Sequence, residues 1–480
     1  MTQLTADIGV LSPELIVVLG GMVLMMLGVF LGDRSQKLVS NLTIALFVLA
    51  GGVVLLGGED RASAFNGAFV ADDFARFIKL LVLSGAALVL IMGQDYVARQ
   101  KLNRFEFPVL VVFSVLGMMT MASAADFITL YLSVELQSLA LYVLAAFDRD
   151  NLRSTEAGLK YFVLGALSSG MMLYGISLVY GFAGTISFAK VATIVETGGV
   201  SIGLIFGLVF LIAGLAFKVS AVPFHMWTPD VYEGAPTPIA AFFSASPKIA
   251  AMALFVRTMI EAFPDATGQW RQIVIFISIL SMALGAVAAI GQNNIKRLMA
   301  YSSIANMGYV LIGLAAGTAQ GVQGVLIYLA IYLVTNIGVF ACILAMRRGD
   351  HMVENINDLS GLAQTRPAYA FVFAMLMFSL AGIPPLAGFF GKFYVFLAAV
   401  NAGLYPLAVI GVVASVVGAY YYLRIVKIIY FDEPAPEFER DMGLRLGAII
   451  AGAGVFTIFF VLGAAPLVSS AARAASALFP

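Results

Sequence analysis

The sequence predicts an all-α protein that crosses a lipid bilayer many times. Of its 480 residues, 61% are hydrophobic and only 11% are charged, whereas a soluble domain is close to half apolar and a quarter charged. The mean hydropathy is +0.98. Apolar runs of about 20 residues, the length that a helix needs to cross the hydrocarbon core, recur along the chain. Helices are expected for these runs, because an unpaired backbone group is costly in lipid.

We expect about fourteen transmembrane helices within one membrane domain, residues 1–480. The apolar runs lie at roughly 13–31, 38–57, 74–93, 107–123, 127–147, 159–181, 202–227, 237–260, 271–291, 298–316, 322–346, 368–401, 405–430 and 444–468. No linker between them is long enough to form a separate domain. The first run is expected to be a retained span, because Asp7 and Glu14 flank it where a signal peptide would carry positive charge.

Two of these helices, the seventh and the twelfth, are predicted to be broken. The twelfth run is long and holds Pro384-Pro385 near its middle, and the seventh contains Pro223. Proline removes a backbone donor and clashes with the preceding turn. Such breaks leave free carbonyl groups inside the bundle, where only protein or a polar cavity can satisfy them.

The charges of the loops predict the orientation of the chain. Lysine and arginine favour cytoplasmic loops, and they are concentrated in the odd-numbered loops, at Arg34, Lys37, Arg99, Lys101, Arg104, Arg149, Arg153, Lys296, Arg297, Arg347, Arg348, Arg366, Arg440 and Arg445. The even-numbered loops hold little more than Arg61, Lys190 and Arg271. We therefore expect a multi-pass protein of a bacterial inner membrane with both termini outside, in the periplasm.

The chain also contains a faint internal repeat. A shift of 167 residues places 142–144 on 309–311, Arg257 on Arg424, and the seventh run on the twelfth. Helices 4–8 would then match helices 9–13, and because five is odd the second copy would be inverted, as in many transporters. We expect an N-terminal three-helix segment at 1–106, repeats at 107–260 and 271–430, and a C-terminal helix at 444–480.

Ionisable side chains interrupt the apolar runs. A charge at the centre of a bilayer costs at least about 2.5–3.5 kcal/mol, so such residues are candidates for function. Glu135 lies within the fifth run and Lys218 at comparable depth in the seventh. If they pair, a change in their separation would make the lysine bind or release a proton. The alternative is a neutral, hydrogen-bonded Glu135 with only a structural role.

Two further lysines have no acid within their own runs. Lys248 lies about eleven residues into the eighth run, and Lys392 follows Pro384-Pro385 by about two turns. Either could accept a proton from chains of water or hydroxyl groups, with Ser244, Ser246, Ser302, Ser303 and Ser415 as candidate hydroxyls. The alternative for Lys248 is snorkelling to the membrane surface, and the serines could simply pack helices.

Two accessory positions are less specific. His225 lies between Lys218 and Lys248 in sequence and is suited to proton relay, although it could instead cap the broken helix. Lys160 lies near the cytoplasmic end of the sixth run. It could serve proton entry, or it could extend its side chain to the surface.

Other functions find no support in the sequence. The net charge is zero, and no polybasic run suggests a nucleic-acid partner. Cys342, the single cysteine, lies in an apolar run and is expected to be an inert small hydrophobe. No Cys/His spacing indicates a metal or cluster site, so no cofactor is expected in this chain.

Three motifs carry a resemblance to a known family. They are KVSAVPFHMWTPDVYEGAPTPIAAFFSASPK at 218–248, NIKRLMAYSSIANMGY at 294–309 and AGIPPLAGFFGKFYVF at 381–396. They resemble the proton-translocating antiporter-like subunits of respiratory complex I, and the resemblance covers nearly the whole chain. The chain is most similar to the shorter of these subunits that have a lysine at the position of Lys392.

The resemblance implies a membrane-arm subunit that moves protons while electrons pass to quinone elsewhere. Glu135 and Lys218 match the family's switch pair, Lys248 its central lysine and Lys392 its terminal lysine. Lys160 and His225 match accessory polar positions. NADH, FMN, iron–sulfur clusters and quinone would bind other subunits, and the partners would be membrane-arm subunits, including further antiporter-like ones, and the bilayer.

Two other functions remain open from the sequence. A subunit of a multisubunit sodium/proton antiporter would share the same broken helices and lysines, so the transported ion is undecided. A membrane scaffold without conduction is the other, but it is hard to reconcile with four costly charges inside the membrane.

Overall fold

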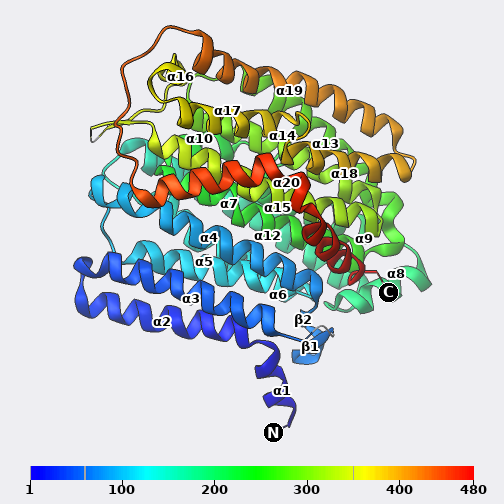
Figure 1. Cartoon of the computed structure of the whole chain (residues 1–480). Helices are drawn as coiled ribbons and strands as arrows, with labels where there is room; N and C mark the ends of the chain where they lie inside the picture. The colour runs from blue at the N-terminus through cyan, green and yellow to red at the C-terminus, as the bar shows by residue number, and fades with distance from the viewer. Residues whose placement is uncertain (1, 59–60, 350, 480) are drawn as a thin grey trace.

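The apolar runs form helices that lie side by side with their loops gathered at the two ends of the bundle (Figure 1). The structure is a computed structural model that describes residues 2–58, 61–349 and 351–479. Both chain ends lie at the same end of the bundle, together with α1 and α8 (Figure 1). With both chain ends on the same side, the chain must cross the bundle an even number of times.

The N-terminal part contributes four helices and one short hairpin. They are α1 (Thr2–Val10), α2 (Ser12–Leu31), α3 (Gln36–Leu56), the antiparallel strands β1 (Ala62–Ala64) and β2 (Phe69–Ala71), and α4 (Asp73–Arg99). The carboxylate of Asp72 accepts a hydrogen bond of 2.8 Å from the N–H of Ala75. This N-cap satisfies one of the free donors at the start of α4 and fixes where the helix begins.

The next part holds the first broken helix. It comprises α5 (Glu106–Ser123), α6 (Phe127–Ala145), α7 (Leu152–Ala183), α8 (Phe188–Gly198), α9 (Ile202–Lys218), α10 (Trp227–Gly234), α11 (Thr237–Ser244) and α12 (Ser246–Arg257), with a π-helical turn at Thr258–Ala262. The predicted break of the seventh helix is present, because α9 ends at Lys218 and Pro223 lies in the irregular segment before α10.

The last part repeats this pattern of long and broken helices. It comprises α13 (Thr267–Ile290), α14 (Ile295–Ala316), α15 (Ala319–Ala345), the strands β3 (Arg347–Arg348) and β4 (His351–Met352), α16 (Leu362–Thr365), α17 (Pro367–Ala381), α18 (Ala387–Asn401), α19 (Tyr405–Phe431) and α20 (Leu444–Ser476). The second predicted break lies between α17 and α18 and contains Pro384-Pro385. The final helix ends at Ser476, eight residues beyond the apolar run at 444–468 and within the predicted C-terminal helix at 444–480.

Twelve helical segments in the described part of the chain are long and apolar enough to cross a membrane. The helices α9, α17 and α18, which flank the two breaks, are shorter than a full span, so the count of fourteen crossings stays a prediction. The most apolar windows of 237–262, α14 and α15 are buried at 100%, 94% and 94% of their residues. These segments therefore form the centre of the bundle.

The eighth predicted span is not one helix. Its two halves, α11 and α12, meet at Ala245, whose φ and ψ of −111° and −98° are not helical. Pro247 follows two residues later and lacks the N–H that a continuous helix would need there. Lys248 is therefore the third residue of α12, at a mid-span break, and does not lie eleven residues into a continuous helix.

Candidate functional site

Lys218 ends α9 and is buried, with 5% of its surface exposed. Its Nζ donates a 2.7 Å hydrogen bond to the Oγ of Ser138 on α6 and lies 5.9 Å from the ring centre of Tyr142. Glu135, one turn from Ser138 on the same helix, accepts a hydrogen bond from Ser169 of α7. The described residues include no ion pair between Glu135 and Lys218. The predicted partners thus lie close, but each is held by a serine.

Aromatic side chains hold the broken end of α9. Trp227, the first residue of α10, donates from Nε1 to the carbonyl of Phe217, 3.1 Å away. The ring of Tyr161 stacks on Trp227 at 4.4 Å between centroids, and Tyr142 meets Tyr161 edge to face. The carbonyl of Phe217 also accepts from the N–H of Ser220 at 3.0 Å, so the indole and the turn after α9 together hold the end of this helix.

Lys248 has 1% of its surface exposed and does not snorkel. Its Nζ donates a 2.6 Å hydrogen bond to the Oγ of Ser303 on α14 and lies 5.4 Å from the ring centre of Tyr232. The hydroxyl of Tyr332 on α15 donates to the same serine oxygen at 2.7 Å. A lysine from one half of the chain is therefore connected to hydroxyl groups of the other half.

More hydrogen-bonding groups lie beside Ser303 in the bundle centre. Ser302 is hydrogen-bonded to the hydroxyl of Tyr422. The amide of Asn306 donates to the carbonyl of Ser302 at 2.8 Å and accepts from the hydroxyl of Tyr328 at 2.6 Å. An internal cavity of about 10 Å³ touches Asn306, Tyr328, Tyr332 and Lys392. That volume is close to the minimum that holds one water molecule.

Lys392 lines this small cavity as well. Its Nζ donates to the Oγ of Ser415 at 2.8 Å and to the carbonyl of Ala381 at 2.9 Å. Ala381 is the last residue of α17, so the lysine satisfies a carbonyl at the break. Lys392 also reaches a separate, largely apolar groove of about 540 Å³ between α18 and α19. Lys392 therefore lies between the hydrogen-bonded groups of the bundle centre and the groove on the outer surface of the bundle.

His225 lies in the irregular segment between α9 and α10, half-buried, beside the exposed Met226. Its Nδ1 is buried and has no hydrogen-bond partner among the described residues. No hydrogen bond in the described part of the chain joins His225 to Lys218 or Lys248. The structure does not place the predicted histidine in the network that holds the lysines.

Lys160 belongs to an ion-pair cluster at the loop end of the bundle. Its Nζ lies 2.7 Å from both Asp230 on α10 and Glu156 on α7. Arg297 of α14 binds Asp230 at 2.7 Å and Glu233 at 2.9 Å. Burial raises the pKa of the Asp230 carboxyl, but the hydrogen bonds from Lys160 and Arg297 outweigh burial and hold the pKa below its usual value.

Lys296 extends this cluster and is not a free loop lysine. It is buried, and its Nζ donates to the carbonyls of Glu233 and Ala235 at 2.9 and 2.8 Å and to Glu354 at 3.0 Å. These carbonyls end α10, where a cation is favoured by the helix dipole. A polar hollow of about 510 Å³ opens here, with Asp148, Glu233, Lys296 and Glu354 in its wall.

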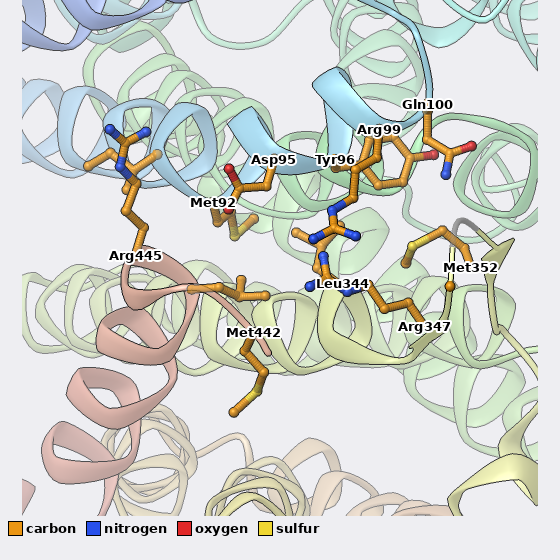
Figure 2. A pocket seen from close by; sticks show the side chains of 13 residues that line it. Met92, Asp95, Tyr96, Arg99, Gln100, Leu344, Arg347, Met352, Met442 and Arg445 are labelled. Carbon is orange, nitrogen blue, oxygen red and sulfur yellow. The ribbon is translucent and has the colours of Figure 1, made fainter. Parts of the chain in front are cut away.

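A second hollow at this end of the bundle lies between the end of α4 and the start of α20. Figure 2 shows Asp95 and Arg99 of α4 facing Arg347 and Arg445 across it. Arg347 pairs with Glu439 at 2.9 Å. Its wall includes none of Glu135, Lys218, Lys248 and Lys392. The residues around it connect α4 to the start of α20.

The sequence prediction missed several polar groups of the site. Tyr328, Tyr332, Tyr422 and Asn306 were not singled out, although Tyr328 and Tyr332 are spaced to share one face of an apolar helix. The serines that hold Glu135 and Lys218 were missed as well. Among the described residues, no group of three or more His, Cys, Asp or Glu side chains is placed to hold a metal ion.

Comparison with known proteins identifies the family. Residues 124–418 match the family model described as NADH:quinone oxidoreductase/Mrp antiporter, TM. The protein named NADH-quinone oxidoreductase subunit N of Parvibaculum lavamentivorans is 59% identical over 468 residues, which cover 98% of this chain and 97% of the relative. Subunit N 1 of Rhizobium meliloti is 58% identical over 479 residues, with 99% of each chain covered.

Solved structures agree with the relatives. A chain of respiratory complex I from Thermus thermophilus is 33% identical, with a TM-score of 0.82 over 96% of this chain and 99% of that one. A chain of the Mrp complex from a Dietzia species has a TM-score of 0.83 over 97% of each chain but only 23% identity, so it shares the fold. The chain therefore belongs to the NADH:quinone oxidoreductase/Mrp antiporter family of membrane subunits, and within it to the relatives named NADH-quinone oxidoreductase subunit N.

Proposed function

We propose that this chain conducts protons across the membrane as a membrane-arm subunit of NADH:quinone oxidoreductase. The observation that carries the proposal is the shared setting of Lys218, Lys248 and Lys392. Each amine is buried and donates to a serine hydroxyl, at 2.7, 2.6 and 2.8 Å. A buried lysine changes its charge readily, and a hydroxyl can pass a proton because it both donates and accepts.

The proposed path begins at the polar hollow beside Glu233 and Lys296, on the side that the loop charges predict to be cytoplasmic. Lys160 lies in the adjoining ion-pair cluster and would assist entry. Protons would reach Lys218 and then Lys248, with His225 as an accessory group. From Lys248 the hydroxyls of Ser303 and Tyr332 lead to the small cavity that Lys392 closes, and Lys392 would release the proton outward.

Glu135 and Lys218 would act as the switch. In this structure Ser138 and Ser169 hold them apart, which corresponds to the separated state of the pair. Approach of the carboxylate would favour the charged amine, and separation would favour proton release. The two serines give each side chain a defined resting partner, so the pair has two alternative sets of hydrogen bonds.

The predicted inverted repeat gains support from a pair of arginines. Arg257 donates to the carbonyl of Ala122 at 3.1 Å, near the end of α5. Arg424 donates to the carbonyl of Ile290 at 3.1 Å, at the end of α13. Each arginine thus caps the first helix of its own proposed repeat, within 107–260 or 271–430. This equivalence favours the predicted frame.

The further assignments follow from the same proposal. NADH, FMN, iron–sulfur clusters and quinone would bind other subunits, and this chain would contact further antiporter-like membrane subunits. Both termini would face the periplasm. A sodium/proton antiporter subunit is the second candidate, and the shared fold of the Dietzia Mrp chain supports it only at the level of architecture.

Isolation of the intact complex through a tag on this chain tests the proposal. The expected complex contains flavin and iron–sulfur subunits, oxidises NADH with quinone, and acidifies the interior of vesicles when reconstituted. A complex of small membrane subunits alone that exchanges sodium for protons would contradict the proposal and favour the antiporter.

A further inference from the structure

A buried lysine and a buried carboxylate form a direct ion pair apart from Lys218, Lys248 and Lys392. Lys79 of α4 binds Glu14 of α2 at 2.8 Å, and each residue has only 3% of its surface exposed. The Nζ of Lys79 lies 4.9 Å from the ring centre of Phe69. A buried pair is weak evidence for stability, because desolvation offsets most of the attraction. Its presence in the N-terminal segment therefore calls for a functional explanation.

Lys79 also lines a cavity of about 370 Å³ between α1, α3 and α4. The exposed residues Gly9, Gly57 and Gly58 form part of the cavity wall, so the cavity opens to the surface of the bundle. The cavity lies at the end of the bundle that carries α1, β1 and β2 (Figure 1). The loop charges predict that this end faces outward, opposite to the polar hollow at Glu233.

The other charged groups near this cavity have their own partners. Asp72 binds Arg257 at 2.7 Å, and Arg257 also binds Glu261 at 3.0 Å. Arg76 pairs with Asp73. Arginine does not lose its proton in proteins, so these pairs carry fixed charge. Among the described residues that line the cavity, Lys79 is the one lysine, and it can therefore lose a proton where the arginines cannot. Its carboxylate partner is Glu14.

The helix α4, which carries Lys79, also contacts the segment that carries Lys248. Val82 lies about one helical turn deeper than Lys79, and its carbonyl accepts a 3.2 Å hydrogen bond from the hydroxyl of Ser246. Ser246 begins α12 at the break beside Ala245, two residues before Lys248. The helix that carries Lys79 therefore packs directly on the break that positions Lys248.

We propose that Lys79, tuned by Glu14, is an outward-facing proton-release group that connects the region of Lys248 to the cavity between α1, α3 and α4. The proposal rests on the proton-conducting function proposed above and adds a second outlet beside Lys392. It gives the N-terminal helices, which lie outside both predicted repeats, a part in transport.

The proposed step moves one proton and restores its starting state. Contact with the Glu14 carboxylate holds the proton on Lys79, so release requires the two side chains to separate. The separated ammonium then gives its proton to water in the cavity, which leaves a neutral amine. The unpaired carboxylate then favours a positive charge at Lys79. A proton arriving from the region of Ser246 and Lys248 binds the amine and restores the ion pair, so the net change is one proton carried outward.

Substitution of Lys79 by arginine separates this role from a structural one. Lys79→Arg keeps the positive charge beside Glu14 but cannot release a proton. A double variant, Glu14→Gln with Lys79→Met, removes both charges, and a merely structural pair should tolerate it. The assay is the initial rate of NADH-driven proton uptake into inverted membrane vesicles, per amount of assembled complex. Lys190→Met, at an exposed position in α8, is the matched control.

We expect both Lys79→Arg and the double variant to reduce proton uptake, but by a smaller factor than Lys248→Met, because the outlet at Lys392 remains. Lys190→Met should keep the wild-type rate. Wild-type uptake in either Lys79 variant, while Lys248→Met is impaired, would overturn this inference and leave the proposed function standing. Wild-type uptake in Lys248→Met as well would instead contradict the proposed function.

Discussion

The amine of Lys392 lies 2.9 Å from the carbonyl oxygen of Ala381, across the break between α17 and α18. A side chain of the second half of the broken helix thus satisfies a carbonyl that ends the first half. Release of this contact would leave a buried acceptor unpaired, which costs about 1–3 kcal/mol. The position of the lysine and the geometry of the break are therefore linked.

Gly382 should be intolerant of a side chain because of this contact. A Cβ there would lie 3.0 Å from Cδ and 3.2 Å from Nζ of Lys392, and the φ of +90° adds backbone strain of about 1–2 kcal/mol. Gly382→Ala should lower both proton pumping and the thermal stability of the purified complex. Gly403→Ala, at a φ of +76° with no atom within 4 Å of the new Cβ, carries the strain alone. Equal pumping in the two variants would argue against a role for the Lys392 contact.

Removal of the hydroxyl that joins Lys248 to Tyr332 should slow proton transfer. Ser303→Ala deletes the acceptor of both groups, and an unpaired buried donor costs about 1–3 kcal/mol. Because the alanine methyl can neither accept nor donate a proton, we expect a roughly tenfold lower pumping rate, which corresponds to about 1.36 kcal/mol in the barrier. Ser177→Ala, at an exposed position on α7, is the control in the same vesicle assay. An unchanged rate in Ser303→Ala would remove this serine from the path.

The separation of Glu135 from Lys218 predicts weak energetic coupling in the resting protein. A double-mutant cycle of Glu135→Gln and Lys218→Met, read from the thermal stability of the complex, should give a coupling energy below about 1 kcal/mol. The directly paired Glu14 and Lys79 provide the comparison. Loss of one partner of a buried pair costs about 3–5 kcal/mol, so the same cycle there should give a clearly larger value. Similar coupling in both cycles would mean that Glu135 and Lys218 are in contact at rest.

Asp230 should stabilise the protein at neutral pH and lose this effect only in acid. Its pKa lies below the usual value of 3.8, so the unfolded chain binds its proton at higher pH than the folded chain. The contribution is complete well above pH 4 and disappears as pH falls through the lower, folded value. Asp230→Asn should reduce the free energy of unfolding at pH 7 by up to about 1 kcal/mol, as for exposed ion pairs.

The difference between this variant and the wild type should shrink progressively as the pH falls below the usual carboxyl pKa. Melting temperatures in detergent, measured as a series from pH 7 into acid, follow this difference. Asp265→Asn, at an exposed position before α13, should have no effect at any pH of the series. A destabilisation by Asp230→Asn that persists in full in acid would contradict the role of its charge.

Much of the fold could be predicted because its signals are local. Apolar runs and the prolines at 223 and 384–385 mark most helices and two breaks. The third break, at Ala245, also has a local signal in Pro247, but the uniformly apolar sequence around it suggested one continuous span. The burial of Lys248 was predicted correctly. Its place in the helix was wrong, because a break resets where the helix begins.

The partners of the buried charges could not be predicted from local sequence. Ser303 and Lys248 are 55 residues apart, and Glu14 and Lys79 are 65 apart, so their contacts depend on how helices from distant parts of the chain pack. The tyrosines of α15 were missed for a different reason. In a membrane helix they are equally suited to apolar packing, and only the neighbouring serine and asparagine reveal their hydroxyls as part of a network.

Proton pumping by Lys248→Met is the measurement that tests the account most directly. Methionine has a similar shape but cannot carry a proton, and Lys248 is the residue through which both proposed outlets receive protons. In inverted vesicles containing equal amounts of assembled complex, we predict that NADH-driven proton uptake is lost or reduced at least tenfold. Uptake at the wild-type rate in this variant would contradict the proposed relay.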